Sequence, residues 1–138
     1  MPDEPSFQTA LRVVMMPRDT NRYGTIFGGV ILSYIDQAGF IEARRHGRHR
    51  WVTASLQQVS FRHPVHTGDV VSFQTRTLDT GTTSVKVRIR VVAERFTTGE
   101  TVEVTEATTT MVAIDGGGNP IPFRSPASVG PPESVNNS

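Results

Sequence analysis

The sequence predicts an α+β domain in which one antiparallel sheet of five to six strands wraps around a single long helix. The chain has 138 residues, which is the usual size of one domain. Apolar residues recur at helical spacing in only one segment, at about residues 28–45. After that segment the pattern changes to the alternation of strands, interrupted by short turns. Because short turns join antiparallel neighbours, the sheet is expected to be antiparallel.

The first half of the chain holds one strand and the helix. A loose tail at residues 1–6 precedes a predicted strand at 7–15, and turn-forming residues fill 16–24. The helix carries apolar residues on most sides, so we expect it to be buried on most sides. It ends with positive charge in its last turn and glycine just past it, at Arg44-Arg45-His46-Gly47.

Four further strands follow, at residues 51–61, 70–78, 84–93 and 103–114. Composition changes at Gly116, where three glycines are followed by five of the nine prolines, between Pro120 and Pro132. We therefore expect one domain at residues 7–115. The Gly- and Pro-rich residues 116–138 are expected to form an extended or disordered tail.

The composition excludes several classes of function. Net charge is +1, which gives no strong field for nucleic acid or an acidic membrane surface. The chain has no cysteine, so thiolate nucleophiles and cysteine-ligated metals are excluded. The apolar stretch 25–35 is too short to span a bilayer, and the N-terminus lacks the basic and then apolar pattern of a secretory signal. A cytoplasmic protein is expected.

Gly28-Gly29 opens the predicted helix and is the first candidate for chemistry. Without side chains there, another group can approach the first amides of the helix, which have no intrahelical partner. These amides and the positive end of the helix dipole favour a developing negative charge. Losing one such donor typically costs about 3 kcal/mol of transition-state stabilisation. The alternative is a tight turn in which the glycines only relieve crowding.

Asp36 and Asn21 are the next candidates. Asp36 lies about two turns into the helix among apolar residues, where a charge is costly unless it is paired or used. Burial would raise its pKa and make it a better base. The residues alone leave open whether Asp36 is functional or occupies a polar stripe. Asn21 could hold a water or a carbonyl oxygen, or could cap a turn.

Together these residues form the string Asn-x-x-Gly-x-Ile-Phe-Gly-Gly, with Asp seven residues after the second Gly. The string closely resembles the acyl-CoA thioesterases of the hotdog superfamily, of the YciA-like and brain acyl-CoA hydrolase type. Segments 59–65, 68–71 and 81–85 also resemble that family and come in its order. The resemblance covers about residues 15–114.

The resemblance implies a hotdog fold and hydrolysis of acyl-CoA to free fatty acid and CoA. It implies a homodimer with joined sheets, often assembled into a hexamer as a trimer of dimers, with each active site at a dimer interface. Asp36 would act as general base or nucleophile, and Asn21 of the facing subunit would position water or substrate. The amides at Gly28 and Gly29 would polarise the thioester carbonyl. No metal or bound cofactor is implied, and CoA enters only as part of substrate and product.

The phosphates of CoA call for basic side chains and free amides or hydroxyls near the pocket mouth. The predicted substrate and CoA contacts lie in the family-like segments: Phe27, Ser60, Arg62, Gly81, Thr82, Thr83 and Ser84. Lys86, Arg88 and Arg90 share one strand face and are interpreted as its solvated side. His46 and His49 lie in the basic stretch 44–50, which is interpreted as a solvated loop rather than a metal site.

The sequence leaves two alternatives open. A hotdog dehydratase usually needs a His paired with an acid at the active helix, and this helix has no His until its end. A non-catalytic acyl-CoA-binding or regulatory hotdog domain is disfavoured, but not excluded, by the presence of both Asn21 and Asp36.

Overall fold

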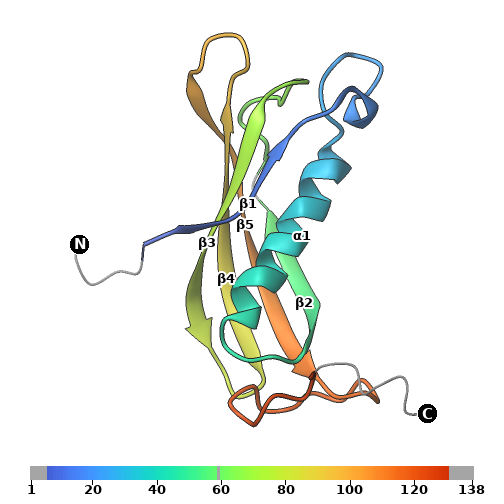
Figure 1. The fold of residues 1–138 in the computed structure, drawn as a ribbon, viewed down its shortest axis with the longest axis vertical. Coiled ribbons are helices and arrows are strands. Elements are labelled where there is room, and N and C mark those ends of the chain that lie inside the picture. The colour runs from blue at the N-terminus through green and yellow to red at the C-terminus, as the bar shows by residue number, and fades with distance from the viewer. Residues whose placement is uncertain (1–5, 59, 131–138) are drawn as a thin grey trace.

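A computed structural model of the chain, which describes residues 6–58 and 60–130, has one long helix lying across one curved sheet (Figure 1). The elements in chain order are β1 (Gln8–Val14), the short 3-10 helix η1 (Pro17–Asp19), α1 (Gly28–Arg44), β2 (Arg50–Gln58), β3 (Val70–Thr80), β4 (Ser84–Glu94) and β5 (Thr101–Ile114). The predicted α+β class, with five antiparallel strands and one long helix, is confirmed. The predicted bounds agree with these to within three residues.

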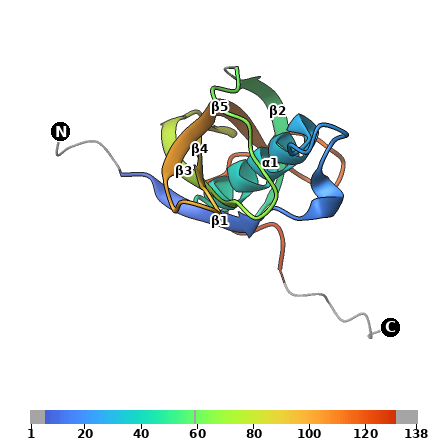
Figure 2. The ribbon, with the colours of Figure 1, turned by 90° about the horizontal axis from the view of Figure 1, so that it is seen from above.

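The strand order in the sheet is β1-β3-β4-β5-β2, and every neighbouring pair is antiparallel. The hairpins from β3 to β5 form the centre, and β2 crosses to the far side to pair with β5. Seen from above, the sheet curls around α1 (Figure 2). β1 and β2 are therefore the edge strands of the sheet that the described residues form.

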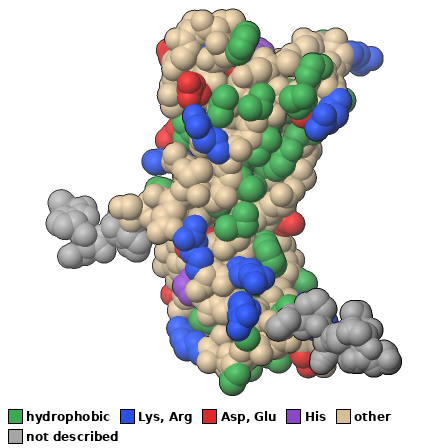
Figure 3. Space-filling model, in the orientation of Figure 1, with side chains coloured by type: hydrophobic (Ala, Val, Ile, Leu, Met, Phe, Trp, Pro, Cys, Tyr) green, Lys and Arg blue, Asp and Glu red, His purple; other side chains and the backbone are tan. Residues whose placement is uncertain are grey.

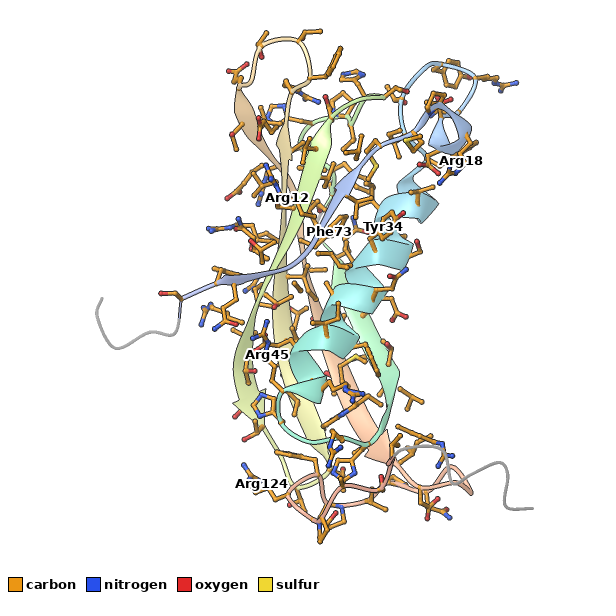
Figure 4. All side chains as sticks on the ribbon, in the orientation of Figure 1. Arg12, Arg18, Tyr34, Arg45, Phe73 and Arg124 are labelled. Atoms are coloured by element: carbon orange, nitrogen blue, oxygen red, sulfur yellow. The ribbon has the colours of Figure 1, made fainter. Side chains whose placement is uncertain are left out.

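The core lies between α1 and the concave face of the sheet. In β4 the alternate residues Val85, Val87, Ile89 and Val91 are fully buried, as the strand pattern predicts. From the helix, Ile31, Ile35 and Ala38 pack against this face. Half-buried Tyr34 points toward Phe73 of β3, with ring centroids 5.6 Å apart (Figure 4).

The prediction that α1 is buried on most sides is wrong for the single chain. Exposed residues occur along most of its length: Gly29, Ser33, Asp36, Gln37, Phe40 and Arg44. The reason is that the sheet covers the helix on the side of β3 and β4, whereas on the other side it ends at the edge strand β2. Apolar periodicity does not distinguish a core face from a face left open beside an edge strand.

The segment after β5 packs against the domain, so the predicted boundary at residue 115 differs from the structure. We call residues 116–130 the C-terminal segment. Phe123 is 2% exposed, and the backbone amides of Ile121 and Ser128 donate to Ala113 and Arg48. The segment contains no helix or strand, and therefore left no periodic signal in the sequence. Residues 131–138 of the predicted tail, and 1–5 of the N-terminal tail, lie outside the described residues.

The solvated loop predicted at residues 44–50 is also only partly observed. Arg44, Arg45 and Arg48 are exposed, and Lys and Arg side chains gather near the end of α1 (Figure 3). His49, however, is 2% exposed because the C-terminal segment covers it. Among the described residues, no helix is long and apolar enough to cross a membrane.

Candidate active site

A groove of about 660 Å³ opens between α1 and β2. Its lining comes from the helix, from β2 and from β5: Asp36, Gln37, Phe40, Ile41, Trp51, Val52, Thr53 and Met111. Most of these side chains are apolar, and Asp36 is the one ionisable group among the lining residues that the structure describes. A pocket of this size with few polar groups is the usual form of a small-molecule site.

Asp36 presents its carboxylate at this groove. It projects from the open face of α1 and is exposed in the single chain, contrary to the burial expected for it. The hydroxyl of Thr53, on β2, donates a hydrogen bond to Asp36 Oδ1 at 2.5 Å. This hydrogen bond occupies one carboxylate oxygen and leaves the other free to accept a proton from a water or to contact a substrate.

A second carboxylate on the same helix, that of Glu42, has a structural role. Glu42 is 7% exposed and accepts hydrogen bonds from the hydroxyls of Thr75 and Thr77 at 2.9 and 2.8 Å. Arg45 forms an ion pair with it at 3.2 Å. The partners of Glu42 are therefore all supplied inside the chain, whereas among the described residues Thr53 is the hydrogen-bond partner of Asp36, which faces an open groove.

Asn21 lies in the loop before α1 and caps a turn, as one of its two interpretations predicts. Its side-chain oxygen accepts hydrogen bonds from the amides of Tyr23 and Thr25, at 2.8 and 3.2 Å. Its amide nitrogen donates to the Thr25 hydroxyl at 2.9 Å. These bonds hold the loop that leads into the helix. Asn21 is not among the residues that line the groove at Asp36.

The helix begins at Gly28, with Phe27 as its N-cap, and Phe27 is 52% exposed. A Cβ atom on Gly28 would lie 3.2 Å from Cε2 of Phe61, whereas one on Gly29 would meet nothing within 4 Å. Crowding therefore accounts for glycine at position 28 but not at 29. A small hollow of about 150 Å³ adjoins Gly28 and includes Phe61 and His63 in its lining.

One chain does not bring the helix N-terminus to the carboxylate. Gly28 and Asp36 are eight residues apart on α1, which corresponds to about 12 Å along the helix axis. Oxyanion donors and a base or nucleophile act at roughly 3 Å from the reacting atoms. Within a single chain, these two groups cannot act on the same carbonyl.

The predicted CoA contacts also lie apart. Arg62 pairs with Glu103 at 2.9 Å, beside the start of β5, and exposed Ser60 lies close to it in the chain. The turn formed by Gly81, Thr82, Thr83 and Ser84 lies at the other end of the sheet. Glu103 is opposite Val92 of β4, which is eight residues from Ser84, or about 26 Å along the strand.

The turn at residues 81–84 is partly occupied by other contacts. The carbonyls of Thr82 and Thr83 accept hydrogen bonds from the amides of Phe123 and Ala113. Arg124 donates to the Gly81 carbonyl at 3.3 Å and lies at the lower end of the molecule (Figure 4). The turn therefore combines a guanidinium with the hydroxyls that the sequence predicted there.

Thr53 was missed by sequence reasoning. It is seventeen residues from Asp36, and the two meet only because β2 returns along the open face of α1. No spacing rule for a helix or a hairpin predicts that contact. The alternation of Trp51 and Thr53 on one side of a strand is the signal that could have indicated it.

Among the described residues, no group of three His, Cys, Asp or Glu side chains is placed to hold a metal ion.

An antiparallel sheet wrapped around one long helix is a hotdog-type fold, and here it carries a carboxylate in the groove beside an edge strand. The family model of the thioesterase superfamily matches residues 23–100. The chain therefore belongs to the thioesterase superfamily.

Individual relatives agree with this family. The chain is 37% identical over 126 residues to the acyl-CoA thioester hydrolase YciA of Salmonella typhimurium, covering 89% of this chain and 95% of that one. It is 39% identical over 108 residues to the uncharacterized acyl-CoA thioester hydrolase YkhA of Bacillus subtilis, covering 78% of this chain and 63% of that one. The match thus spans less than two thirds of the Bacillus protein. The hexameric thioesterase y2039 from Yersinia pestis superposes with a TM-score of 0.81 at 36% identity, covering 88% of this chain and 99% of that one.

Proposed function

We propose that this protein hydrolyses acyl-CoA thioesters to a free fatty acid and CoA. The observation that carries the proposal is the position of Asp36, a carboxylate exposed at the mouth of an apolar groove and oriented by Thr53. The similar proteins YciA and YkhA are both named acyl-CoA thioester hydrolases, which supports the same substrate class.

The reaction needs an attacking oxygen and a stabilised oxyanion. Asp36 starts the attack on the thioester carbonyl carbon, either by taking a proton from a water or by adding to the carbon itself. The amides at Gly28 and Gly29 stabilise the oxyanion that forms. The C–S bond then breaks, and the CoA sulfur leaves and is protonated. In the second route, water then hydrolyses the acyl-Asp36 anhydride.

The 12 Å between Gly28 and Asp36 argues that each active site takes these groups from two subunits. The edge strand β2 is suited to that assembly, since Val52 is 42% and Leu56 36% exposed and its outer edge is unpaired in the described chain. We propose a dimer joined through β2, with Asn21 and the helix N-terminus of one subunit facing Asp36 of the other. A hexamer, as named for the Yersinia pestis structure, would be a trimer of such dimers.

The proposed reaction uses no metal or bound cofactor, and we place it in the cytoplasm. Because Arg62 and the turn at residues 81–84 lie far apart in one chain, we propose that different subunits supply them to one CoA. A dehydratase is disfavoured because the groove lining formed by the described residues contains no histidine.

Mixing inactive subunits tests the two-subunit site. The Asn21→Ala and Asp36→Ala variants should each hydrolyse acyl-CoA poorly, and subunit exchange between them should restore part of the activity, measured as release of free thiol. Mixing Asp36→Ala with Asp36→Asn is the matched control, and should restore nothing. Absence of recovery after exchange is confirmed would exclude the shared site.

A further control separates the two roles of Asn21. Asn21→Asp keeps the side-chain oxygen that accepts from the Tyr23 and Thr25 amides but loses the amide nitrogen. We expect it to retain the loop and the fold, and to lose activity if the amide contacts the substrate or water. Wild-type protein that releases no thiol from any acyl-CoA would overturn the proposed function and favour a binding domain.

A further inference from the structure

The groove at Asp36 leads toward a buried tryptophan. From Asp36 and Thr53 the lining continues to Ile41 on α1 and Trp51 on β2. Ile41 lies five residues beyond Asp36 on the helix, and Trp51 lies two residues from Thr53 on the strand. Each step corresponds to about 7 Å along its element. Trp51 is 7% exposed, so its ring is packed into the domain and not free at the surface.

The Trp51 ring is held from behind by several contacts. Its indole nitrogen donates to the Gly47 carbonyl at 2.9 Å. The ring of Phe123, from the C-terminal segment, lies 5.9 Å from it, and the His49 ring lies 6.1 Å from it. A side chain of this size that is fixed on several sides cannot rotate away at low cost.

The C-terminal segment is itself anchored at this place. The two ring nitrogens of buried His49 each lie 2.8 Å from an oxygen, the Phe123 carbonyl and the Ser128 hydroxyl. Gly47 permits the close approach, since a Cβ there would lie 2.8 Å from the Phe123 carbonyl and 2.9 Å from the His49 ring. The position of the Trp51 ring therefore depends on a segment far away in the sequence.

We propose that Trp51, buttressed by Phe123 of the C-terminal segment, is the end wall of the acyl site and sets the upper limit of acyl chain length. The proposal rests on the proposed hydrolase function, which places the thioester carbonyl at Asp36. A chain that leaves this carbonyl along the groove meets Trp51 after about 7 Å. Trp51 is thus a specificity-determining residue that excludes long acyl chains, and it takes no part in the chemical step.

The acyl group is the occupant that fits this part of the groove. Beyond Asp36 and Thr53 the lining is dominated by Phe40, Ile41, Trp51 and Met111. An apolar chain gains free energy by leaving water for such a surface, whereas the phosphates of CoA would lose their hydration without gaining a cation among these lining residues. The CoA portion must therefore leave the carbonyl in another direction.

The test compares hydrolysis of butyryl-CoA and dodecanoyl-CoA by the full-length oligomer. In Trp51→Ala the ratio of kcat/KM for dodecanoyl-CoA to that for butyryl-CoA should rise about tenfold or more, because single pocket contacts discriminate by about that factor. Phe123→Ala should raise the ratio less, by releasing the Trp51 ring. Trp51→Phe keeps a wall and should stay close to wild type.

A second variant, which is expected to change the ratio of kcat/KM values in the opposite direction, keeps the test informative if Trp51→Ala misfolds. Ile41 is half-buried at the same end of the groove, so Ile41→Phe should lower the ratio by filling the site. Leu78→Ala, on β3 and outside the groove, is the control and should leave the ratio unchanged. Thermal unfolding and the oligomeric state are measured for every variant.

The outcomes separate this inference from the function on which it rests. If the wild-type protein hydrolyses both substrates and neither Trp51→Ala nor Ile41→Phe changes the ratio, the end wall is excluded while the hydrolase function stands. Unchanged ratios with a weakened oligomer in both variants would show that a partner subunit occupies this end of the groove. Opposite shifts of the ratio in the two variants confirm the wall.

Discussion

The two faces of α1 have different roles, one in the core and one at the groove. On the face toward β3 and β4, Ile31 and Ile35 are buried to within 1% exposure. On the face toward β2, Asp36, Gln37 and Phe40 are exposed and line a groove. The first face closes the core within one chain, whereas the second ends at an unpaired edge strand. Stability and activity should therefore be separable on a single helix, residue by residue.

The neighbours Ile35 and Asp36 provide the strongest test of that comparison. Ile35→Ala removes a fully buried side chain and should lower the free energy of unfolding by about 2–5 kcal/mol, measured by urea denaturation. Asp36→Asn removes the charge on the open face and should lower kcat by about 10² to 10⁴-fold. Its free energy of unfolding should stay within about 0.5 kcal/mol of wild type.

The reverse assays complete this pair. Ile35→Ala should still release thiol from acyl-CoA at temperatures where it remains folded, because Ile35 is not among the residues that line the groove. Normal turnover by folded Asp36→Asn would remove Asp36 from the reaction. A large loss of stability in that variant would show that the open face also holds the fold.

Asp69, in the turn before β3, sharpens the comparison with a carboxylate that serves stability. It is 2% exposed and pairs with Arg95 at 2.8 Å. Burial alone would raise its pKa, but hydrogen bonds from the amides of His66 and Phe96 and the charge of Arg95 outweigh it and lower the pKa below the usual range. Its stabilising contribution is therefore present above about pH 3.9, the ordinary value, and is lost as pH falls through the lower folded-state pKa.

We expect Asp69→Asn to lower the free energy of unfolding by about 3 kcal/mol at pH 7, since it breaks a buried ion pair. The difference from wild type should shrink as the pH falls through the lowered folded-state pKa of Asp69, because its carboxyl group is then protonated in both states of the wild-type protein. Urea denaturation at pH 7 and in acid measures this change. Glu100→Gln, at an exposed turn, is the control, and a difference for Asp69→Asn that does not depend on pH would contradict the charge argument.

The same contrast explains what could be predicted from the sequence. Periodicity located the helix and five strands to within three residues, because local spacing reports local geometry. It overestimated the burial of Asp36, since residues such as Phe40 and Val52 are apolar but lie on the open side of the fold. The packing of Phe123 and His49 left no periodic signal, because it joins an irregular segment to a loop 74 residues away.

Substitution of Thr53 has the smallest expected effect, and it tests the contribution of a single hydroxyl group on the open face of α1. Thr53→Val keeps the size of the side chain but removes the hydroxyl that donates to Asp36. A hydrogen bond to a charged group contributes about 1.5 kcal/mol at an exposed site, so kcat should fall about tenfold with KM for acyl-CoA unchanged. Thr53→Ser restores the hydroxyl and should restore kcat. If Thr53→Val leaves kcat unchanged and Thr53→Ser lowers it, the methyl group of Thr53 is what matters, and Thr53 supports the groove wall rather than the orientation of the carboxylate.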